Sequence, residues 1–593
     1  MVPRPVLCAL LTLGCAGLAG SAWGSTPAEQ LEFPFAFERM TPIQTPGHVT
    51  PGPVRWTPRA DQVEVLTAFE SVRLTSVPLP DGTTATLDLE RLDVERLNVG
   101  VHIDGVPAPG ALHPLALSVW KGSVEGAPGS EALLSFSNAG SYGWIRRGQE
   151  MLHVSSQAGP GNDWTRYEAT VMTDAQAQTR GAGQPVPCKA EELNGQPPVR
   201  ARSAGSPGQA GGTTTLGLGP VGLFEVTVAV ETDYQYFQNF GDVPATLAYA
   251  TSLMTWISST FETQAQTMLT VPYLGIYTTE DDPWSAPESG QNCFATLFEF
   301  RDAWRGQIPF NADLAHFLSG APLGCGVAYR PGLCNPGFNF GVSGNQNGQT
   351  PFPIMPNGAN LDFIVAAHEL GHNFNAIHTH SYCPPVDQCA PDGFFGACQT
   401  EQVCSFGTIM SYCHLCSDFG NIDTQFHPQS AADMLAYVQT ASCPESFCED
   451  SDGALASCPC GNTGDPDSGC DLQQGTGGVQ IGIALQETLP QNRATFLGTG
   501  FPTSAAPTAL VIRSTGLDAA SPVAFGDGLR CVASPLVRLA ATFASGGVSQ
   551  HALGHGTMAG AGTFYYQIWL RNTPAPFCTP DAFNLSNGST LSW

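Results

Sequence analysis

The feature that most constrains the fold is the stretch AAHELGHNFNAIHTHSYC, residues 366–383, which carries four histidines and one glutamate within thirteen positions. NLDFIVAAHELGHNF, residues 360–374, has an N-cap candidate in Asn360, no proline, and apolar residues available for packing. On such a helix His368 and His372 are four residues apart, so both imidazoles project from one face. This spacing suits two ligands of one tetrahedral zinc ion.

A third ligand must come from beyond the helix. His378 lies six residues after His372, so the helix must end between them. Asn375 stands where the chain must turn back, and asparagine accepts positive φ more readily than most residues. Glu369 can take a proton from the attacking water as general base and pass it to the leaving amine. His380 is the alternative third ligand. The stretch predicts a catalytic zinc centre rather than a polar surface helix.

Three motifs resemble those of one family. HELGHNFNAIH, residues 368–378, resembles the H-E-x-x-H-x-x-G-x-x-H signature of the metzincin zinc peptidases, with Asn375 in place of the usual glycine. GTIMSYC, residues 407–413, resembles their Met-turn, which implies that Met410 forms the hydrophobic floor beneath the zinc. GVAYRPGLC, residues 326–334, resembles the edge strand of the reprolysin-like (adamalysin) branch. In that branch the strand pairs with substrate backbone, which implies this role for Gly326, Val327 and Ala328.

The resemblance covers about residues 223–443 and leaves some alternatives open. Thr379 follows the third histidine where many relatives carry an acid. Tyr412 stands where some metzincins place a tyrosine that approaches the zinc or the oxyanion; the alternative is a packed core tyrosine. Glu231 and Asp233 could join a Ca²⁺ site of the kind that reprolysins carry, or could simply be solvated at a strand end.

Composition divides the chain into segments. Residues 25–203 hold alternating stretches between Gly and Pro, which predict a β-rich domain. Residues 204–220 are the linker, in a Gly-, Pro-, Ser- and Thr-rich stretch that begins at residue 194. Residues 221–445 alternate strand and helix patterns, as in an α/β domain. Residues 446–593 begin with a Cys- and Gly-rich knot and continue with evenly spaced strand patterns, which favour a β-sandwich.

Residues 1–24 read as a secretory signal peptide, because one arginine and an apolar run precede the small residues Ala22 and Gly24. No later segment has the roughly 18 unbroken apolar residues of a membrane helix, so we expect a secreted product without a membrane span. The formal charge is −28, and lysine occurs only at Lys121 and Lys189. Such a chain repels phosphate backbones, which excludes nucleic acid as a partner. Nothing in the sequence sets an oligomeric state.

Cysteine counts also predict an oxidising compartment. Ten cysteines fall between Cys293 and Cys443 and six between Cys448 and Cys578, and even numbers suit disulfide pairing. CHLC, residues 413–416, has the spacing of a zinc knuckle, but in an exported chain this parity favours disulfides. Cys188 stands alone.

Reprolysin-like precursors carry a propeptide cysteine that caps the metal, and this resemblance implies that Cys188 is a latency switch. A thiolate is a good zinc ligand and would displace the water that Glu369 activates. The alternatives are a stray reduced thiol or an intermolecular disulfide. Cleavage near Arg200 or Arg202 would then release residues 25 to about 200.

These patterns predict a multidomain chain with a β-rich propeptide, an α/β metzincin (zincin-like) catalytic domain and a C-terminal β-sandwich. The predicted function is that of a secreted zinc metalloendopeptidase, made as a latent precursor, which hydrolyses protein or peptide substrates. The rival is a catalytically inactive extracellular adhesion or binding protein on a metalloprotease fold. The complete set of His368, His372, His378 and Glu369 favours the enzyme.

Overall fold

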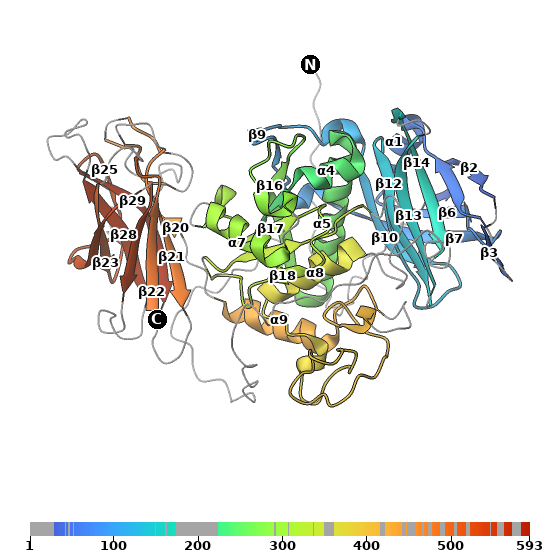
Figure 1. The fold of residues 1–593 in the computed structure, drawn as a ribbon. Coiled ribbons are helices and arrows are strands. Elements are labelled where there is room, and N and C mark those ends of the chain that lie inside the picture. Colours follow the sequence, from blue (N-terminus) through green and yellow to red (C-terminus); the bar gives the residue numbers. More distant parts are fainter. Residues whose placement is uncertain are drawn as a thin grey trace, which may run out of the picture.

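The computed structural model describes residues 29–592, apart from residues 174–222, 349–360, 416–421, 448–457, 487–492, 554–562 and 572–582 and several shorter gaps. A β-rich N-terminal region, an α/β region and a β-rich C-terminal region follow one another along the chain, blue to red in Figure 1. The predicted signal peptide and linker lie outside the described residues, as do Cys188, Arg200, Arg202 and Asn360.

The N-terminal region is built on a ten-stranded sheet. Its central strands run antiparallel from β10 through β14, each hydrogen-bonded to the next. Trp56, Trp120 and Phe136 are fully buried in a core of its own. In spatial order the strands are β1 (Glu29–Glu32), β6 (Ser71–Pro78), β7 (Thr84–Leu92), β10 (Ser118–Val124), β11 (Glu131–Ser137), β12 (Gly140–Arg147), β13 (Glu150–Gly159), β14 (Asp163–Thr173), β5 (Val54–Thr57) and β2 (Ala36–Arg39).

The α/β region contains a seven-stranded sheet in the order β18-β19-β17-β15-β16-β8-β9. The strands from β19 to β8 are parallel, whereas the edge strand β18 runs antiparallel to β19. The predicted strands are present as β15 (Phe224–Thr232), β16 (Thr267–Ile276), β17 (Leu314–Leu318), β18 (Gly326–Ala328) and β19 (Phe340–Ser343), and the predicted helices as α5 (Val243–Ala265), α7 (Cys293–Trp304), α8 (Leu361–Asn373) and α9 (Pro428–Thr440). The α/β expectation is confirmed.

Two strands of this sheet come from the N-terminal region. β8 (Val101–Ile103) pairs in parallel with β16, and β9 (Val106–Pro107) pairs with β8 at the edge. They belong to the segment between β7 and β10. The chain therefore leaves the ten-stranded sheet after β7, adds β8 and β9 to the seven-stranded sheet, and returns to the ten-stranded sheet at β10. The sequence did not predict this exchange, nor the short helix α4 (Tyr234–Phe240) that follows β15.

Helix α5 joins the two regions. Asp242 caps it by accepting a hydrogen bond from the Ala245 amide at 2.7 Å, and Gln266 ends it in the left-handed conformation. The helix packs on β16 and also on β10, β11 and β12 (Figure 1). Being covered from several sides, it is buried along most of its length, as a helix without a strongly polar face must be.

Disulfides fix the loops around the α/β region. Cys293–Cys325 ties the start of α7 to the residue before β18, and Cys383–Cys398 and Cys389–Cys413 close loops after α8. Cys413, the first cysteine of the CHLC stretch, is therefore in a disulfide, as the even number of cysteines in this region predicted. Within the described residues, no helix is both long enough and apolar enough to cross a membrane.

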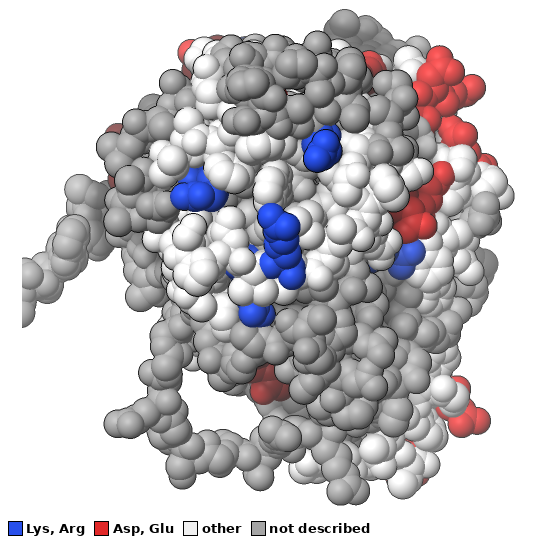
Figure 2. All heavy atoms as spheres, turned by 90° about the vertical axis from the view of Figure 1, so that its left-hand side faces the viewer, with Lys and Arg blue, Asp and Glu red and all other residues white. Residues whose placement is uncertain are grey.

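The C-terminal region contains a five-stranded and a three-stranded sheet. One apolar cluster draws residues from both, including Ile481 and Phe496 from the smaller sheet and Val511 and Tyr566 from the larger. Figure 2 faces this end of the molecule and shows a few basic side chains dispersed over it, with acidic ones mostly toward the right-hand edge and a few near the top, left and bottom. The strands are β20 (Ser446–Phe447), β29 (Phe583–Ser592), β28 (Thr563–Arg571), β23 (Thr508–Ser514) and β26 (Val537–Phe543), then β21 (Gln480–Gln486), β22 (Arg493–Thr499) and β27 (Ser549–Leu553).

Candidate metal centre

Three histidines converge at the end of α8. His368 and His372 lie on the helix, His378 follows it, and all three are buried. The Nε2 atom of His378 lies 3.1 Å from that of His372 and 3.0 Å from that of His368. These three residues form a group that could hold a metal ion. The structure thus brings together the residues that the spacing predicted.

The chain turns back to His378 through Asn375. This residue has φ +71°, so the predicted positive φ is confirmed. Its amide donates to the His372 carbonyl at 2.8 Å and the Ala376 amide donates to the Gly371 carbonyl at 2.9 Å, a pair of bonds that ends a helix with a left-handed residue. Arg330 adds a contact that the sequence did not reveal, because its Nη1 donates to Asn375 Oδ1 at 3.0 Å.

We expect Asn375→Gly to keep zinc binding and Asn375→Val to weaken it. Glycine adopts positive φ without strain, whereas a β-branched residue there costs about 1–3 kcal/mol. Zinc affinity and thermal unfolding of both variants are the measurements. Equal behaviour of glycine and valine would show that backbone strain at this turn does not matter.

Backbone carbonyls fix the tautomers of the two helical histidines. His368 Nδ1 lies 2.6 Å from the Ile409 carbonyl oxygen, and His372 Nδ1 lies 2.8 Å from that of Ala376. A carbonyl only accepts, so each Nδ1 carries the proton and each Nε2 presents a lone pair to the centre. Burial, and then the neighbouring His368, lowers the pKa of His378 well below its usual value, which favours a neutral imidazole there too.

This donor set fits zinc. Lone pairs facing one another at about 3 Å in a buried site repel unless a cation lies among them. Neutral imidazole nitrogen is a preferred zinc ligand, and a second hydrogen bond from each ring to a carbonyl is the usual support for such a ligand.

The predicted Met-turn lies directly behind the helix. Met410 is fully buried, and a Cβ at Gly371 would lie 2.8 Å from Met410 Sδ. A side chain at position 371 would therefore collide with Met410 where it lies. Thr379, which replaces the usual acid, donates from its amide and hydroxyl to the Met410 carbonyl at 3.0 and 3.2 Å. The hydroxyl thus helps to hold the segment that carries His378.

The edge strand β18 lies against Glu369. Gly326, Val327 and Ala328 form this strand, as predicted, and all three are buried. A Cβ at Gly326 would meet Glu369 Oε1 and lie 2.9 Å from Cδ. Glu369 is itself fully buried. Only glycine at position 326 lets the strand pass this carboxyl group.

Gly326→Ala is expected to displace the Glu369 carboxyl group and, if Glu369 is the general base that the sequence predicts, to lower peptide hydrolysis by 10-fold or more, the order of magnitude expected when such a group moves by about 1 Å. Zinc content should stay at the wild-type value, because the three atoms nearest to the new methyl group all belong to Glu369, which is not part of the candidate metal group. Ala328→Gly is the control for strand propensity. Unchanged activity in Gly326→Ala would contradict the close approach.

The rings of Tyr412 and His380 both pack against that of His378. The Tyr412 ring is 4.5 Å from the His378 ring and 4.7 Å from that of His380, and the rings of His378 and His380 stack at 5.1 Å. Tyr412 also belongs to a small apolar cluster with Ala390. The group of converging ligand atoms contains His378 and not His380.

The acids considered for calcium lie elsewhere. Asp233 caps α4 by accepting from the Tyr236 amide at 2.8 Å, and it also accepts from the Gly320 amide at 2.9 Å. Glu231 accepts from Trp284 Nε1 at 3.2 Å, and burial raises the pKa of its carboxyl group to about 8. Neither acid belongs to a candidate metal group among the described residues, so a Ca²⁺ site is not supported. The second such group, Asp387 with Cys389 and Cys413, contains a disulfide.

Residues 224–421 match the model of Metallo-peptidase family M12 (Reprolysin_5). The match confirms the family resemblance over this segment and supports a metallopeptidase there, a class that uses zinc and acts on proteins or peptides. No curated protein matches the chain.

Similar solved structures include two of wild-type OgpA from Akkermansia muciniphila and one of catalytically inactive OgpA with an O-glycopeptide (glycodrosocin) substrate. Their identities to this chain are 11%, 12% and 10%, and their TM-scores are 0.17, 0.19 and 0.18. The alignments cover 62%, 63% and 62% of this chain and 93%, 93% and 92% of theirs. At these TM-scores the likeness carries no argument.

Proposed function

We propose that this chain is a zinc metalloendopeptidase of the reprolysin-like type, in which His368, His372 and His378 bind one zinc ion and Glu369 is the general base. The observation that carries the proposal is the convergence of the three rings, in which His378 Nε2 lies 3.0 Å from that of His368 and 3.1 Å from that of His372, and in which two of the rings are held by backbone carbonyls.

Zinc bound by these imidazoles would supply a Lewis acid that polarises the scissile carbonyl and lowers the pKa of water to about 7. Glu369 takes a proton from the attacking water and delivers it to the leaving amine. Gly326, Val327 and Ala328 pair with the extended substrate backbone, which lies alongside the Glu369 carboxyl group as a result. Met410 packs against α8 at Gly371 and so supports the helix that carries two of the ligands. Tyr412 helps to position the His378 ring by packing on it.

The protein is proposed to be secreted, with a signal peptide at 1–24, a β-rich region at 25–203, a linker at 204–220, the peptidase at 221–445 and a β-sandwich at 446–593. The disulfides among the described residues support an oxidising compartment. The apolar cluster between the two C-terminal sheets supports the sandwich.

The enzyme is proposed to be made as a latent precursor, with Cys188 as a zinc ligand that blocks the site. In the uncleaved chain, Cys188→Ser should raise peptidase activity, because a hydroxyl group is a far weaker zinc ligand than a thiolate. The measurement compares initial rates of the two uncleaved proteins at equal zinc content. A serine variant no more active than wild type contradicts the switch.

The rival function is an inactive binding protein on the same fold. Casein or gelatin hydrolysis by the linker-cleaved protein, with and without a zinc chelator, separates the two. Chelator-sensitive cleavage that returns with added zinc supports the peptidase. Absence of any chelator-sensitive cleavage supports the binding protein.

A further inference from the structure

We infer that the β-rich N-terminal region is a lasting part of the folded peptidase and stays bound when the chain is cut between residues 174 and 222. This inference concerns residues 29–173 and the α/β region, and it does not depend on the proposed activity. It departs from the expectation that cleavage near Arg200 or Arg202 releases residues 25 to about 200.

The N-terminal region contributes strands to the sheet of the α/β region. β8 pairs in parallel with β16 through Val101, His102 and Ile103, and Asp104 continues the contact by accepting from the Thr278 amide and hydroxyl, both at 2.8 Å. Removal of the N-terminal region would leave the β16 edge with unpaired backbone groups, which a folded protein avoids.

The N-terminal region and the α/β region also share an apolar core. Trp144 of β12 is fully buried, and its ring lies 5.4 Å from Trp256 of α5 and 5.1 Å from Phe363 of α8. Tyr142 lies 5.0 Å from Tyr249 of α5. The N-terminal residues in this cluster are Leu97, Val119, Leu133, Tyr142, Trp144 and Met151. Their burial against α5 and α8 resembles the interior of one domain rather than the more polar contact of two separable domains.

Buried polar groups also pair between the N-terminal region and the segment before α9. Glu131 of β11 is 7% exposed and accepts hydrogen bonds from Thr424 Oγ1 and, at 2.8 Å, from Gln425 Nε2. The Gln425 carbonyl accepts from the Ile409 amide at 3.0 Å, and the Ile409 carbonyl orients His368. A hydrogen-bonded path therefore leads from the N-terminal region to a proposed zinc ligand, and dissociation would leave a buried carboxyl group without these partners.

The N-terminal region also hydrogen-bonds to the segment that holds the first turn of α8. Ser155 of β13 donates to the Gly348 carbonyl at 3.0 Å, and the Gly348 amide donates to Asp362 in the first turn of α8 at 2.7 Å. Together with Trp144 on Phe363, this supports the helix that carries His368 and His372. The N-terminal region thus contacts both elements that position the candidate site.

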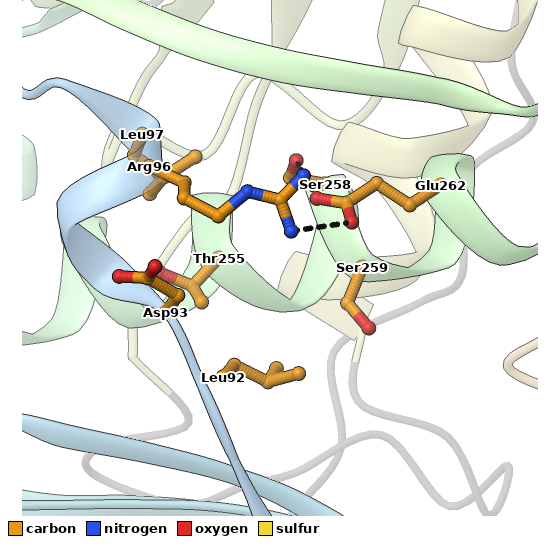
Figure 3. Close-up of a pocket in the computed structure, with 8 residues that line it drawn as sticks. All are labelled: Leu92, Asp93, Arg96, Leu97, Thr255, Ser258, Ser259 and Glu262. Atoms are coloured by element: carbon orange, nitrogen blue, oxygen red, sulfur yellow. Dashed lines mark hydrogen bonds and ion pairs between the residues drawn. The ribbon is translucent and has the colours of Figure 1, made fainter. Parts of the chain in front are cut away.

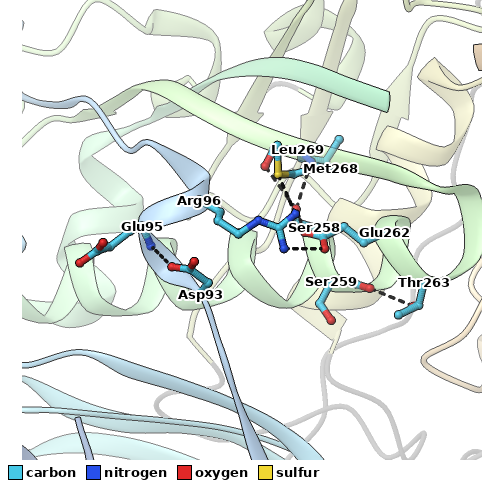
Figure 4. A network of polar contacts seen from close by, with 9 residues as sticks. All are labelled: Asp93, Glu95, Arg96, Ser258, Ser259, Glu262, Thr263, Met268 and Leu269. Atoms are coloured by element: carbon cyan, nitrogen blue, oxygen red, sulfur yellow. Dashed lines mark hydrogen bonds and ion pairs between the residues drawn. The ribbon is translucent and has the colours of Figure 1, made fainter. Parts of the chain in front are cut away.

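Polar side chains also pair across the contact between the N-terminal region and the α/β region. The 3-10 helix η1 (Val94–Leu97) faces α5 across a small pocket lined from both sides (Figure 3). Across it Arg96 Nη1 lies 3.3 Å from Glu262 Oε2, and Arg96 Nη2 lies 3.1 Å from Met268 Sδ (Figure 4). Arg146 forms a further ion pair with Asp423 at 2.9 Å. These pairs fix the register of an interface that the apolar core stabilises.

Cleavage near Arg200 or Arg202 would therefore leave β8 and Trp144 in place against the α/β region. The active enzyme is then a non-covalent complex of two fragments of one chain. Loss of the N-terminal fragment would unfold the site rather than open it.

The test places a recognition sequence for a site-specific protease within residues 204–220 of the full chain. After complete cleavage, the two fragments should co-elute at 1:1 in size-exclusion chromatography in native buffer and separate only in denaturant. Separate elution in native buffer overturns the inference. The readout needs no peptidase activity, so its failure is distinguishable from failure of the proposed function.

Two neighbouring leucines on β11 supply a matched pair of variants. Leu133 belongs to the shared core and Leu134 to the core of the N-terminal sheet, since successive side chains on a strand point to opposite faces. In the cleaved protein, Leu133→Ala should lower the urea concentration at which the fragments separate by more than Leu134→Ala does. An equal or smaller effect of Leu133→Ala contradicts the shared core.

Discussion

Glu369→Gln is expected to lower kcat on a peptide substrate by about 10²–10⁴-fold, the usual effect of losing a general base. The carboxamide has nearly the same shape, so it fits beside Gly326, but it cannot accept a proton from water. Zinc stoichiometry should remain at the wild-type value, because Glu369 is not among the converging ligand atoms.

The matched control is Glu231→Gln. Glu231 is also a fully buried glutamate, but burial raises its pKa to about 8, so it is mostly protonated at pH 7 and the amide mimics it. This control should keep turnover near that of wild type. Wild-type turnover in Glu369→Gln would rule out the proposed mechanism.

The second large effect concerns the third ligand. His378→Ala should abolish stoichiometric zinc binding, whereas His380→Ala should retain one zinc per chain, because only His378 directs its Nε2 to those of His368 and His372. Loss of zinc should also remove the stability that binding confers, about 4 kcal/mol when zinc is present at 1,000 times its dissociation constant. The thermal midpoint should therefore fall more in His378→Ala.

Metal analysis after dialysis and calorimetry of both variants are the measurements. Both substitutions remove one buried imidazole, so a difference between them reflects ligation rather than packing. Zinc loss in His380→Ala with retention in His378→Ala would make His380 the third ligand, the alternative that the sequence left open.

Local sequence patterns were sufficient for much of the fold. The apolar runs of β15 and β16 and the helical spacing of α5 predicted these elements close to their observed bounds. The spacing of His368 and His372 predicted that these two rings converge, and the resemblance to the metzincin signature added His378. The tolerance of asparagine for positive φ predicted the turn at Asn375. These features depend on residues within a few positions of one another.

Features that depend on distant residues were not predictable in the same way. The pairing of β8 with β16 joins residues far apart in the chain, and no periodicity within β8 reveals its partner. The bonds from Glu131 to Thr424 and Gln425 are equally non-local. The need for glycine at positions 326 and 371 becomes clear only in the structure, which places Glu369 against Gly326 and Met410 against Gly371.

One metal ion, held by three histidines, is proposed to be needed for peptide-bond hydrolysis. The most direct test titrates zinc into the metal-free, linker-cleaved protein while peptide cleavage is followed. Activity should rise in proportion to bound zinc and reach its plateau at one zinc per chain, with no rise in Glu369→Gln at the same occupancy. Cleavage that persists without metal, or its absence at full zinc occupancy, would contradict the account.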